Sequence, residues 1–550
     1  MSINAGWLGK ILKIDLSSKT HKIIEPNLDL YQKYLGGRGL AGWFAGRDPD
    51  FLDAQIIPPL YIFSGPLAGS GAQGSASTNI FSRSPLTGGI SFSSFQGDFA
   101  LDLKKLGFDG LIISGVASEL CGLRIDPVGF ELETHEDLAE KTVNQLIREH
   151  NLGSSSLLVG KAAHLGVSFA GIISGELQMS TSGGLGKVMA AKNLSFIKLE
   201  TADGPGQSAK QKLNPEIART ISASPFLAGK FGLKHYGTGV IFDLAAYYEL
   251  LPTANFTRSK FAQASQVNSI SLFRQFPAKA KICPHCSLGC RKITEKSQVF
   301  PDYTAMAVFS ALLDHHDPQL VMTAFNFCLQ YGLEPRNTAA AMSTWAEIEG
   351  EEFAKLEVWD LLKEIAENRA RGSALKEGAE VYAQLRGKPE AAMTINNQAV
   401  FPINPRGAVG VGLGYLTTTG TEAFFNSFAF GPEILGKPVL VDRLSLEGKA
   451  RLVKAGEDKS AVSGSLALCP LLATTIPLAV YAKILSELSN QAFSGNSLLQ
   501  SGEEIIANER RLNHQLKLKS PSLPSRLFDE NNFTREKLNK ALEIYNKLRK

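Results

Sequence analysis

The chain has 550 residues, of which 44% are hydrophobic and 20% charged, and its formal net charge is +4. At about 150 residues per domain, this length predicts three or four domains, and the composition excludes wholesale disorder. The near balance of 57 basic and 53 acidic residues also argues against a nucleic-acid-binding protein, which is usually more basic.

The beginning of the sequence and its longest uncharged stretch indicate where the protein is located. The opening MSINAGWLGKILKIDLSS has neither the apolar region nor the cleavage site of a signal peptide. Residues 461–482 form the longest stretch without charge, but Pro470, Pro477 and several Ser and Thr residues favour buried core over a membrane span. We therefore expect a cytoplasmic protein without a membrane partner.

The first two hundred residues carry the signals of a β-rich domain. Short apolar runs bounded by Gly, Ser and Pro predict strands within residues 6–18, 59–67, 109–116 and 155–160, and helices near 101–106 and 141–150. No segment repeats at a recognisable period. The polar residues 201–216 are predicted to be a linker.

Downstream of this linker the apolar spacing becomes helical. Residues 307–333 and 337–372 carry apolar side chains at helical intervals, and residues 532–550 predict an amphipathic helix. A second boundary is expected near Pro402. The sequence therefore predicts an α+β multidomain chain, in which a β-rich N-terminal domain precedes a mostly helical remainder.

The strongest chemical signal is the sequence KICPHCSLGCRK, which spaces Cys283, Cys286 and Cys290 as C-x2-C-x3-C. Three local thiolates and one remote thiolate are typical of a 4Fe-4S cluster, and Cys469, followed by a proline in an apolar stretch, is a plausible fourth ligand. The alternatives are a structural zinc held by these three cysteines with His285 or a remote cysteine, and a set of reduced buried cysteines.

Two glycine-rich segments imitate nucleotide-binding motifs. Gly69, Gly71 and Gly74 spell G-x-G-x-x-G, but no helical pattern follows, so a glycine-rich turn is expected. The sequence GGLGKV at residues 183–188 lacks the first Gly and the final Ser or Thr of a phosphate loop. Its backbone N–H groups, at Gly183, Gly184 and Gly186 among others, could still receive an anion.

Several segments together resemble one family, the aldehyde:ferredoxin oxidoreductases. The matching segments are YLGGRGLAGWF (34–44), residues 63–90 with SPLTGG at 84–89, GGLGKVMAAKNL (183–194), HYGTG (235–239), LPTANF (251–256), the cysteine motif, NPRGAVGVGLGY (404–415), EGKARLV (447–453), ERRLN (509–513) and LPSR (523–526). They follow one another in order along nearly the whole chain.

The resemblance implies a saddle-like β domain at residues 1–205 and two helical domains at 206–400 and 401–550. It implies a tungsten or molybdenum bis-pyranopterin on the saddle and a 4Fe-4S cluster that passes electrons to ferredoxin or a ferredoxin-like subunit. Cys283, Cys286, Cys290 and Cys469 fall on the family's cluster ligands.

The pterin-anchoring positions depart from the family's pattern. The leading carboxylates of the two Asp-x-x-Gly-Leu-Asp/Cys motifs fall on Leu329 and Gly464. The remaining replacements are Ser77 and Ser182 for the phosphate-binding arginines, Ser94 for the magnesium-holding asparagine, Thr304 for the active-site Glu, and Ala423 or Phe424 for the active-site His. Serine brings no charge to a phosphate.

These departures leave it uncertain whether the chain is an enzyme. One interpretation is a cluster-carrying electron-transfer or structural subunit with a weakened or lost pterin site, which pairs with ferredoxin, an active paralogue or another copy of itself. A second is an active tungsten or molybdenum enzyme that interconverts aldehydes and acids. Arg38, Arg83, Ser94 and the glycines at 183, 184 and 186 would then help to hold the pterins or another anion. A third is a zinc-stapled scaffold.

Overall fold

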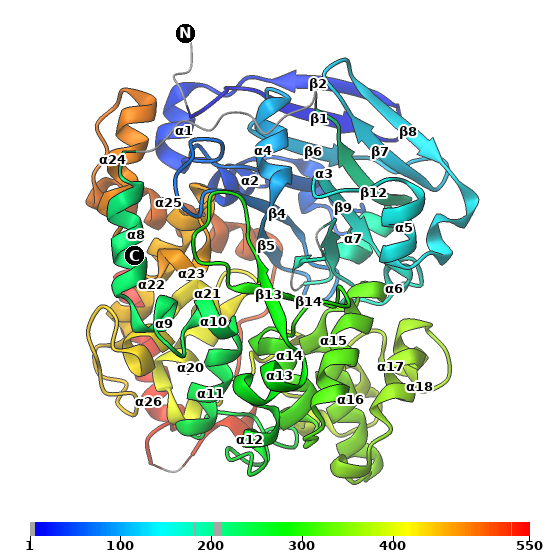
Figure 1. The fold of residues 1–550 in the computed structure, drawn as a ribbon, viewed down its shortest axis with the longest axis vertical. Helices are drawn as coiled ribbons and strands as arrows, with labels where there is room; N and C mark the ends of the chain where they lie inside the picture. Colours follow the sequence, from blue (N-terminus) through cyan, green and yellow to red (C-terminus); the bar gives the residue numbers. More distant parts are fainter. Residues whose placement is uncertain (1–5, 176, 181–182, 202–211, 530) are drawn as a thin grey trace.

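The computed structural model describes residues 6–175, 177–180, 183–201, 212–529 and 531–550. Its β-rich first part, coloured blue to cyan in Figure 1, lies across the top of the molecule. Helices coloured green lie below it on the right, and the orange and red helices of the C-terminal part lie on the left. The prediction of an α+β chain with a β-rich start and a helical remainder is confirmed.

The first sheet has six strands in the order β2-β1-β6-β3-β4-β5. Its strands are β1 (Ile11–Asp15), β2 (Thr20–Ile24), β3 (Leu60–Phe63), β4 (Ser77–Arg83), β5 (Ile90–Gln96) and β6 (Gly110–Ser114). The central strands β3 and β6 are apolar and fully buried, as expected for strands covered on both faces. The edge strand β2 is largely exposed and carries a lysine, which disfavours pairing with other chains.

The second sheet also has six strands, in the order β11-β10-β9-β12-β7-β8. Its strands are β7 (Cys121–Ile125), β8 (Phe130–Thr134), β9 (Ser156–Val159), β10 (Ile172–Ser174), β11 (Met179–Ser180) and β12 (Leu194–Leu199). The four predicted strand regions correspond to β1, β3, β6 and β9.

The two sheets have the same topology, although the sequence shows no recognisable repeat. In the first sheet, β1 and β2 form an antiparallel hairpin, β1 pairs in parallel with β6, and β6 pairs antiparallel with β3. In the second sheet, β7 and β8 form the hairpin, β7 pairs in parallel with β12, and β12 pairs antiparallel with β9. Strands β4 and β5 complete the first sheet, and β10 and β11 complete the second, so that β5 and β11 occupy equivalent edges. The first part of the chain is therefore a structural duplication.

Short helices connect the strands of the two sheets. They are α1 (Leu28–Tyr34), α2 (Gly37–Ala45), α3 (Pro49–Leu52), α4 (Asp98–Lys105), α5 (Val143–Glu149), α6 (Lys161–His164) and α7 (Leu185–Ala191). The helices predicted near residues 101–106 and 141–150 correspond to α4 and α5. Asn27 caps α1 through its side chain, which accepts a hydrogen bond from the Leu30 N–H.

Helices dominate the rest of the chain, apart from the hairpin β13 (Ala278–Lys281) and β14 (Arg291–Thr294) and the short strands β15 (Thr394–Ile395) and β16 (Gln398–Ala399). The helices up to residue 400 are α8 (Asn214–Ala223), α9 (Pro225–Ala228), α10 (Leu233–Tyr236), α11 (Gly239–Tyr247), α12 (Ala264–Val267), α13 (Ser269–Gln275), α14 (Tyr303–Ala307), α15 (Pro318–Tyr331), α16 (Pro335–Glu349), α17 (Val358–Ala366), α18 (Arg371–Leu375) and α19 (Ala379–Leu385). The later helices are α20 (Val409–Thr417), α21 (Ala423–Ser427), α22 (Lys449–Ser465), α23 (Pro470–Ala473), α24 (Leu478–Ser489), α25 (Gly495–Gln515) and α26 (Arg535–Leu548).

The predicted C-terminal helix corresponds to α26, which buries Leu538, Ala541 and Tyr545. Most of the uncharged residues 461–482 are buried, as expected for core, and no helix in the described ranges is long and apolar enough to cross a membrane. Much of the predicted linker lies outside the described residues. The division of the helical part near residue 400 stays a prediction.

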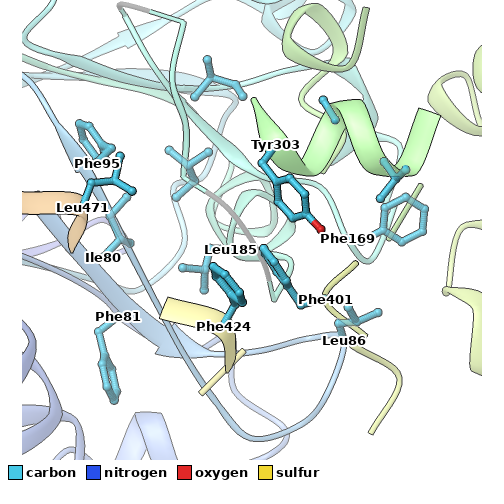
Figure 2. Packing of buried hydrophobic residues seen from close by; sticks show 14 of the residues in the cluster. Ile80, Phe81, Leu86, Phe95, Phe169, Leu185, Tyr303, Phe401, Phe424 and Leu471 are labelled. Atoms are coloured by element: carbon cyan, nitrogen blue, oxygen red, sulfur yellow. The ribbon is translucent and has the colours of Figure 1, made fainter. Parts of the chain in front are cut away.

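An aromatic core joins the helical segments to each other. The rings of Phe401 and Phe424 stack with their centroids 4.2 Å apart, and Tyr303 packs 5.6 Å from Phe401. Figure 2 shows these three side chains side by side, on segments far apart in the sequence. Because Phe424 fills this core, it is not available as an active-site group.

A buried ion pair joins the first part to the C-terminal helices. Arg38 on α2 is 2% exposed, and its Nε and Nη2 atoms each donate to Glu509 on α25 at 2.7 Å. Its Nη1 donates to the Asn426 side chain at 2.9 Å, and its guanidinium lies 3.6 Å from the Phe92 ring centroid. All of these partners come from segments far from Arg38 in sequence.

We expect Arg38→Met to lower the free energy of unfolding by about 3–5 kcal/mol, because it leaves the buried Glu509 carboxylate without its partner. The matched control is Lys33→Met, which breaks an ion pair with Glu504 on the same helix α25, but with both side chains about half exposed. That loss should stay below about 1 kcal/mol. Denaturant titration of both variants measures the difference, and equal losses would contradict the role assigned to Arg38.

Acid should destabilise the fold through His164, whose Nε2 lies 3.0 Å from the Ser195 hydroxyl. Burial lowers the pKa of this imidazole from 6.5 to about 4, so between these values the unfolded chain binds a proton that the folded chain does not. Stability therefore falls as the pH drops through this window. In urea titrations at several pH values, His164→Gln should show a shallower loss than the parent, and identical slopes would refute this assignment.

Candidate functional site

The four cysteines of the predicted cluster site come together on the wall of one cavity. Cys283, Cys286 and Cys290 lie in the loop between β13 and β14, in the hairpin that crosses the middle of the molecule in Figure 1. Cys469 precedes α23. The cavity has a volume of about 810 Å³ and lies between the first sheet and the helical parts.

Gly74 fixes both cysteine segments through its backbone. Its N–H donates to the carbonyl of His285 at 2.8 Å, and its carbonyl accepts from the N–H of Cys469, also at 2.8 Å. A side chain at this position would have its Cβ 2.7 Å from Leu472, and the φ of +76° also requires glycine. The third glycine of the G-x-G-x-x-G sequence is thus a structural clamp in a turn.

The loop itself also turns at a glycine. Gly289 has a φ of +60°, and a Cβ there would lie 3.1 Å from Ala280. The N–H of Ser287 donates to the Gln73 side chain at 3.0 Å, and the N–H of Leu288 points to the sulfur of Cys286 at 3.4 Å. The loop is therefore held from the first domain before any metal binds.

A single zinc ion bound by the four cysteines would require a close spacing of their sulfurs. A tetrahedral zinc with Zn–S bonds of about 2.3 Å holds its sulfurs about 3.8 Å apart. Within the described ranges, three ligand atoms lie within 4.8 Å of one another only at Glu133, His135 and His150. No three of the four cysteine sulfurs therefore lie within 4.8 Å of one another in the described structure.

The thiols would need a positive centre to ionise together. Burial and the neighbouring cysteines raise the pKa of Cys290 to about 12, and the same two causes raise that of Cys469 well above its usual value. A bound cationic centre displaces such protons and stabilises the thiolates. The residues present therefore fit a 4Fe-4S cluster.

Glu133, His135 and His150 lie close together at the second sheet, but an arginine already pairs with the Glu133 carboxylate. Glu133 lies 2.7 Å from the Nδ1 of His150 and 3.1 Å from the Nε2 of His135, but its other oxygen accepts from Arg124 at 2.5 Å. Arg124 and His150 lower the pKa of Glu133 to about 2 against the effect of its partial burial. This arrangement is an ion-pair network on the surface of the sheet.

The first-domain side of the cavity is polar but nearly uncharged. Its lining residues in the described part of the chain are Arg38, Gly74, Asn79, Phe92, Ser93, Ser94, Phe95, Gln96, Leu177, Gln178 and Met179. Arg38 is the only cation among them, and Glu509 already neutralises it. This wall could hydrogen-bond a pterin, but it offers no free charge to a phosphate.

The other predicted anion-binding residues are not among the described residues that line the cavity. Arg83 donates to the backbone carbonyls of Phe51, Asp53 and Ile56. The glycines at 183, 184 and 186 pack tightly; a Cβ at 184, for example, would lie 2.0 Å from the carbonyl oxygen of residue 168. Of that group only Arg38 and Ser94 are among the described residues that line the cavity, and an anion-binding role for Arg83 and the three glycines stays a prediction.

Of the pterin-site positions at which this chain departs from the family's pattern, some line the cavity and others do not. Thr304 and Gly464 line the cavity, whereas Leu329 is buried in the helical core and Ser77 carries a buried hydroxyl without a partner among the described residues. Ser182 lies outside the described residues, and the structure describes only the backbone of Ala423.

Two unpaired donors at the cavity wall were not predicted from the sequence. Nε2 of Gln96 and Nε of Arg336 are buried and have no hydrogen-bond partner in the described part of the chain. Arg336 Nε lies 4.0 Å from Glu334 Oε1, and Arg336 Nη2 lies 3.4 Å from Glu422 and 3.5 Å from the Thr421 carbonyl. A buried unpaired donor costs about 1–3 kcal/mol unless a ligand or water completes it.

Two sequence profiles cover almost the entire chain. The aldehyde ferredoxin oxidoreductase N-terminal domain matches residues 11–201, and domains 2 and 3 of the same enzyme match residues 212–550. The chain belongs to the aldehyde ferredoxin oxidoreductase family. The resemblance that the sequence motifs indicated is thereby confirmed.

Individual relatives agree with this assignment. The tungsten-containing aldehyde ferredoxin oxidoreductase of Pyrococcus furiosus is 28% identical, over 96% of this chain and 92% of the relative. The WOR-like subunit of the aliphatic sulfonate oxidoreductase of the same organism is 24% identical, over 62% of this chain and 59% of the relative. The BamBC active-site complex of benzoyl coenzyme A reductase, solved with 1,5-dienoyl-CoA, shares the fold with a TM-score of 0.82 at 17% identity, covering 100% of this chain and 95% of that one.

Removing the remote cysteine tests the cluster site of this family member. We expect Cys469→Ser to lower the iron content of anaerobically purified protein to well below about four per chain, with loss of its broad visible absorbance. The matched control is Cys121→Ser in β7, whose buried thiol donates to the backbone carbonyl of Asn193 and does not line the cavity. The control should keep its iron. Equal iron in the two variants would exclude Cys469 as a ligand.

Proposed function

We propose that this chain is an iron–sulfur member of the aldehyde ferredoxin oxidoreductase family that transfers electrons in the cytoplasm through one 4Fe-4S cluster. Cys283, Cys286, Cys290 and Cys469 would hold the cluster, which supplies one-electron transfer when bound. The observation that carries the proposal is the convergence of these four cysteines, from two distant segments, on one cavity wall.

The state of the pterin site is the second part of the proposal. The first-domain wall retains hydrogen-bonding groups such as Asn79 and Gln96, but its only cation is Arg38, which is already paired. Phosphate groups are usually held by arginine forks or lysines. We therefore propose that a bis-pyranopterin is weakly held or absent, and that the chain acts as an electron-transfer or structural subunit.

The proposed electron partner is a ferredoxin or a ferredoxin-like iron–sulfur subunit. The family name includes ferredoxin, and one relative is itself described as a subunit of an oxidoreductase. In this arrangement a catalytically active paralogue, or another copy of this chain, would complete the assembly.

A specific observation favours a second candidate function, an active tungsten or molybdenum enzyme acting on aldehydes or acids. The cavity of about 810 Å³ is far larger than a cluster requires, and Gln96 and Arg336 each direct an unpaired donor atom at its wall. The 28% identical relative is tungsten-containing. In this case the protein would position and hydrogen-bond the cofactor, and the cofactor would supply the chemistry.

Metal analysis of anaerobically purified protein separates the two functions. We expect about four iron atoms per chain with neither tungsten nor molybdenum in comparable amount. Iron with about one tungsten or molybdenum per chain would instead establish the second function, and the next measurement would be aldehyde-dependent dye reduction. One zinc without iron would contradict both.

A further inference from the structure

The outer end of the cavity carries a set of unpaired cations. Helix α22 lines the cavity with one face, on which Arg451, Ala455, Lys459 and Ser463 follow at intervals of four residues. At a rise of about 1.5 Å per residue, Lys459 lies about 12 Å along the helix from Arg451, and Gly464 about 8 Å farther. A Cβ at Gly464 would lie 3.3 Å from Arg38, so α22 spans the cavity from its exposed end to its inner wall.

The cations of α22 differ according to the side they face. Lys449 pairs with Glu433 at its Nζ, and Lys454 pairs with Asp458 at 3.0 Å, away from the cavity. Arg451 and Lys459, which do line the cavity, form no ion pair with any residue that the structure describes. Among the described residues, the one hydrogen bond of the Lys459 ammonium is long, 3.5 Å to the Thr474 carbonyl.

A third cation reaches the same end from another segment. Lys437, in the loop after residue 435, is exposed, lines the cavity, and has no ion pair among the described residues. Burial alone lowers the pKa of Lys459 to about 8, as expected for an ammonium without a neighbouring carboxylate.

The acidic residues that line the cavity already have hydrogen-bond or ion-pair partners. Glu334 accepts from the N–H groups of Arg336 and Asn337, Glu422 pairs with Arg336 at 3.4 Å, and Asp302 caps α14. They leave Lys437, Arg451 and Lys459 uncompensated. Apolar side chains stand beside these cations, including Val439, which is 65% exposed, and the cavity-lining Leu452 and Phe428.

We propose that Lys437, Arg451 and Lys459, which line the cavity at successive places, make it a binding site for an organic anion, with the carboxylate or phosphate group attracted by these cations and the apolar body lying along α22. Cations in an apolar cleft attract and orient such an anion, and a charged hydrogen bond there is stronger than one in water. The site does not depend on which metal the inner part of the cavity holds.

Calorimetric titration of the full-length, anaerobically purified protein tests the site. The probes are 4-phenylbutyrate and its uncharged counterpart 4-phenylbutan-1-ol, with phenyl phosphate as a second anion. We expect the carboxylate or the phosphate to bind at least about tenfold more tightly than the alcohol, with affinity falling as salt is added. The anion that binds more tightly identifies the preferred charged group.

Variants assign the binding to these residues. The double variant Arg451→Ala and Lys459→Ala should raise the Kd for the anion about tenfold or more, and Lys459→Arg should retain most of the affinity. The matched control is Lys10→Ala, which removes an exposed lysine in the first domain, away from the cavity. It should bind like the parent.

Three results would overturn the proposal: no binding of either anion, equal binding of anion and alcohol, or an unchanged Kd in the double variant. Iron measured on the same preparations keeps this test separate from the proposed electron-transfer function. Anion binding can fail with the cluster intact, and a protein without a cluster can still bind the anion.

Discussion

The ion pair between Arg38 and Glu509 connects the duplicated β domain to the C-terminal helices, and it also determines the electrostatics of the cavity. Both side chains are almost completely buried, and Asn426 and Phe92 complete the surroundings of the guanidinium. A charge buried in this way is stable only with its partner in place. The interaction that joins the domains therefore withdraws from any ligand the only cation among the described first-domain residues of the cavity wall.

This arrangement gives the cavity two chemically distinct ends. The inner end has the cysteines, neutral hydrogen-bonding groups and the ion pair of Arg336 with Glu422, while the outer end has cations without carboxylate partners among the described residues. An electron-transfer centre suits the first environment, since buried thiols held by backbone hydrogen bonds are rigid and shielded from water. Small or polar anions suit the second. Helix α22 connects the two ends, and its small residues leave room between them.

The sequence predicted the features that depend on local spacing and missed those that depend on tertiary contacts. The C-x2-C-x3-C motif is local, and the β-rich start and helical remainder follow from hydrophobic periodicity. The family resemblance brought Cys469 to the other cysteines, which spacing alone could not do. Arg38 was predicted to bind a cofactor, because no sequence pattern shows that Glu509, far along the chain, occupies it.

The same limit applies to residues whose role depends on backbone position. Arg83 looked available for an anion, yet its guanidinium donates to three backbone carbonyls within the first domain. Gly74 looked like part of an incidental turn, but its peptide group fixes both cysteine segments. Side-chain types predict which chemistry is possible, whereas partners from other segments decide which groups remain free for it.

The duplication of the two six-stranded sheets has a consequence for the shape of the inner wall. The equivalent edge strands β5 and β11 lie next to each other, and the side chain of Gln178 donates to the carbonyl of Gln96 between them. Both edges contribute to the cavity. Two edges of the same topological position therefore meet at one wall. Their side chains have diverged, so the two edges offer different groups to a molecule bound in the cavity.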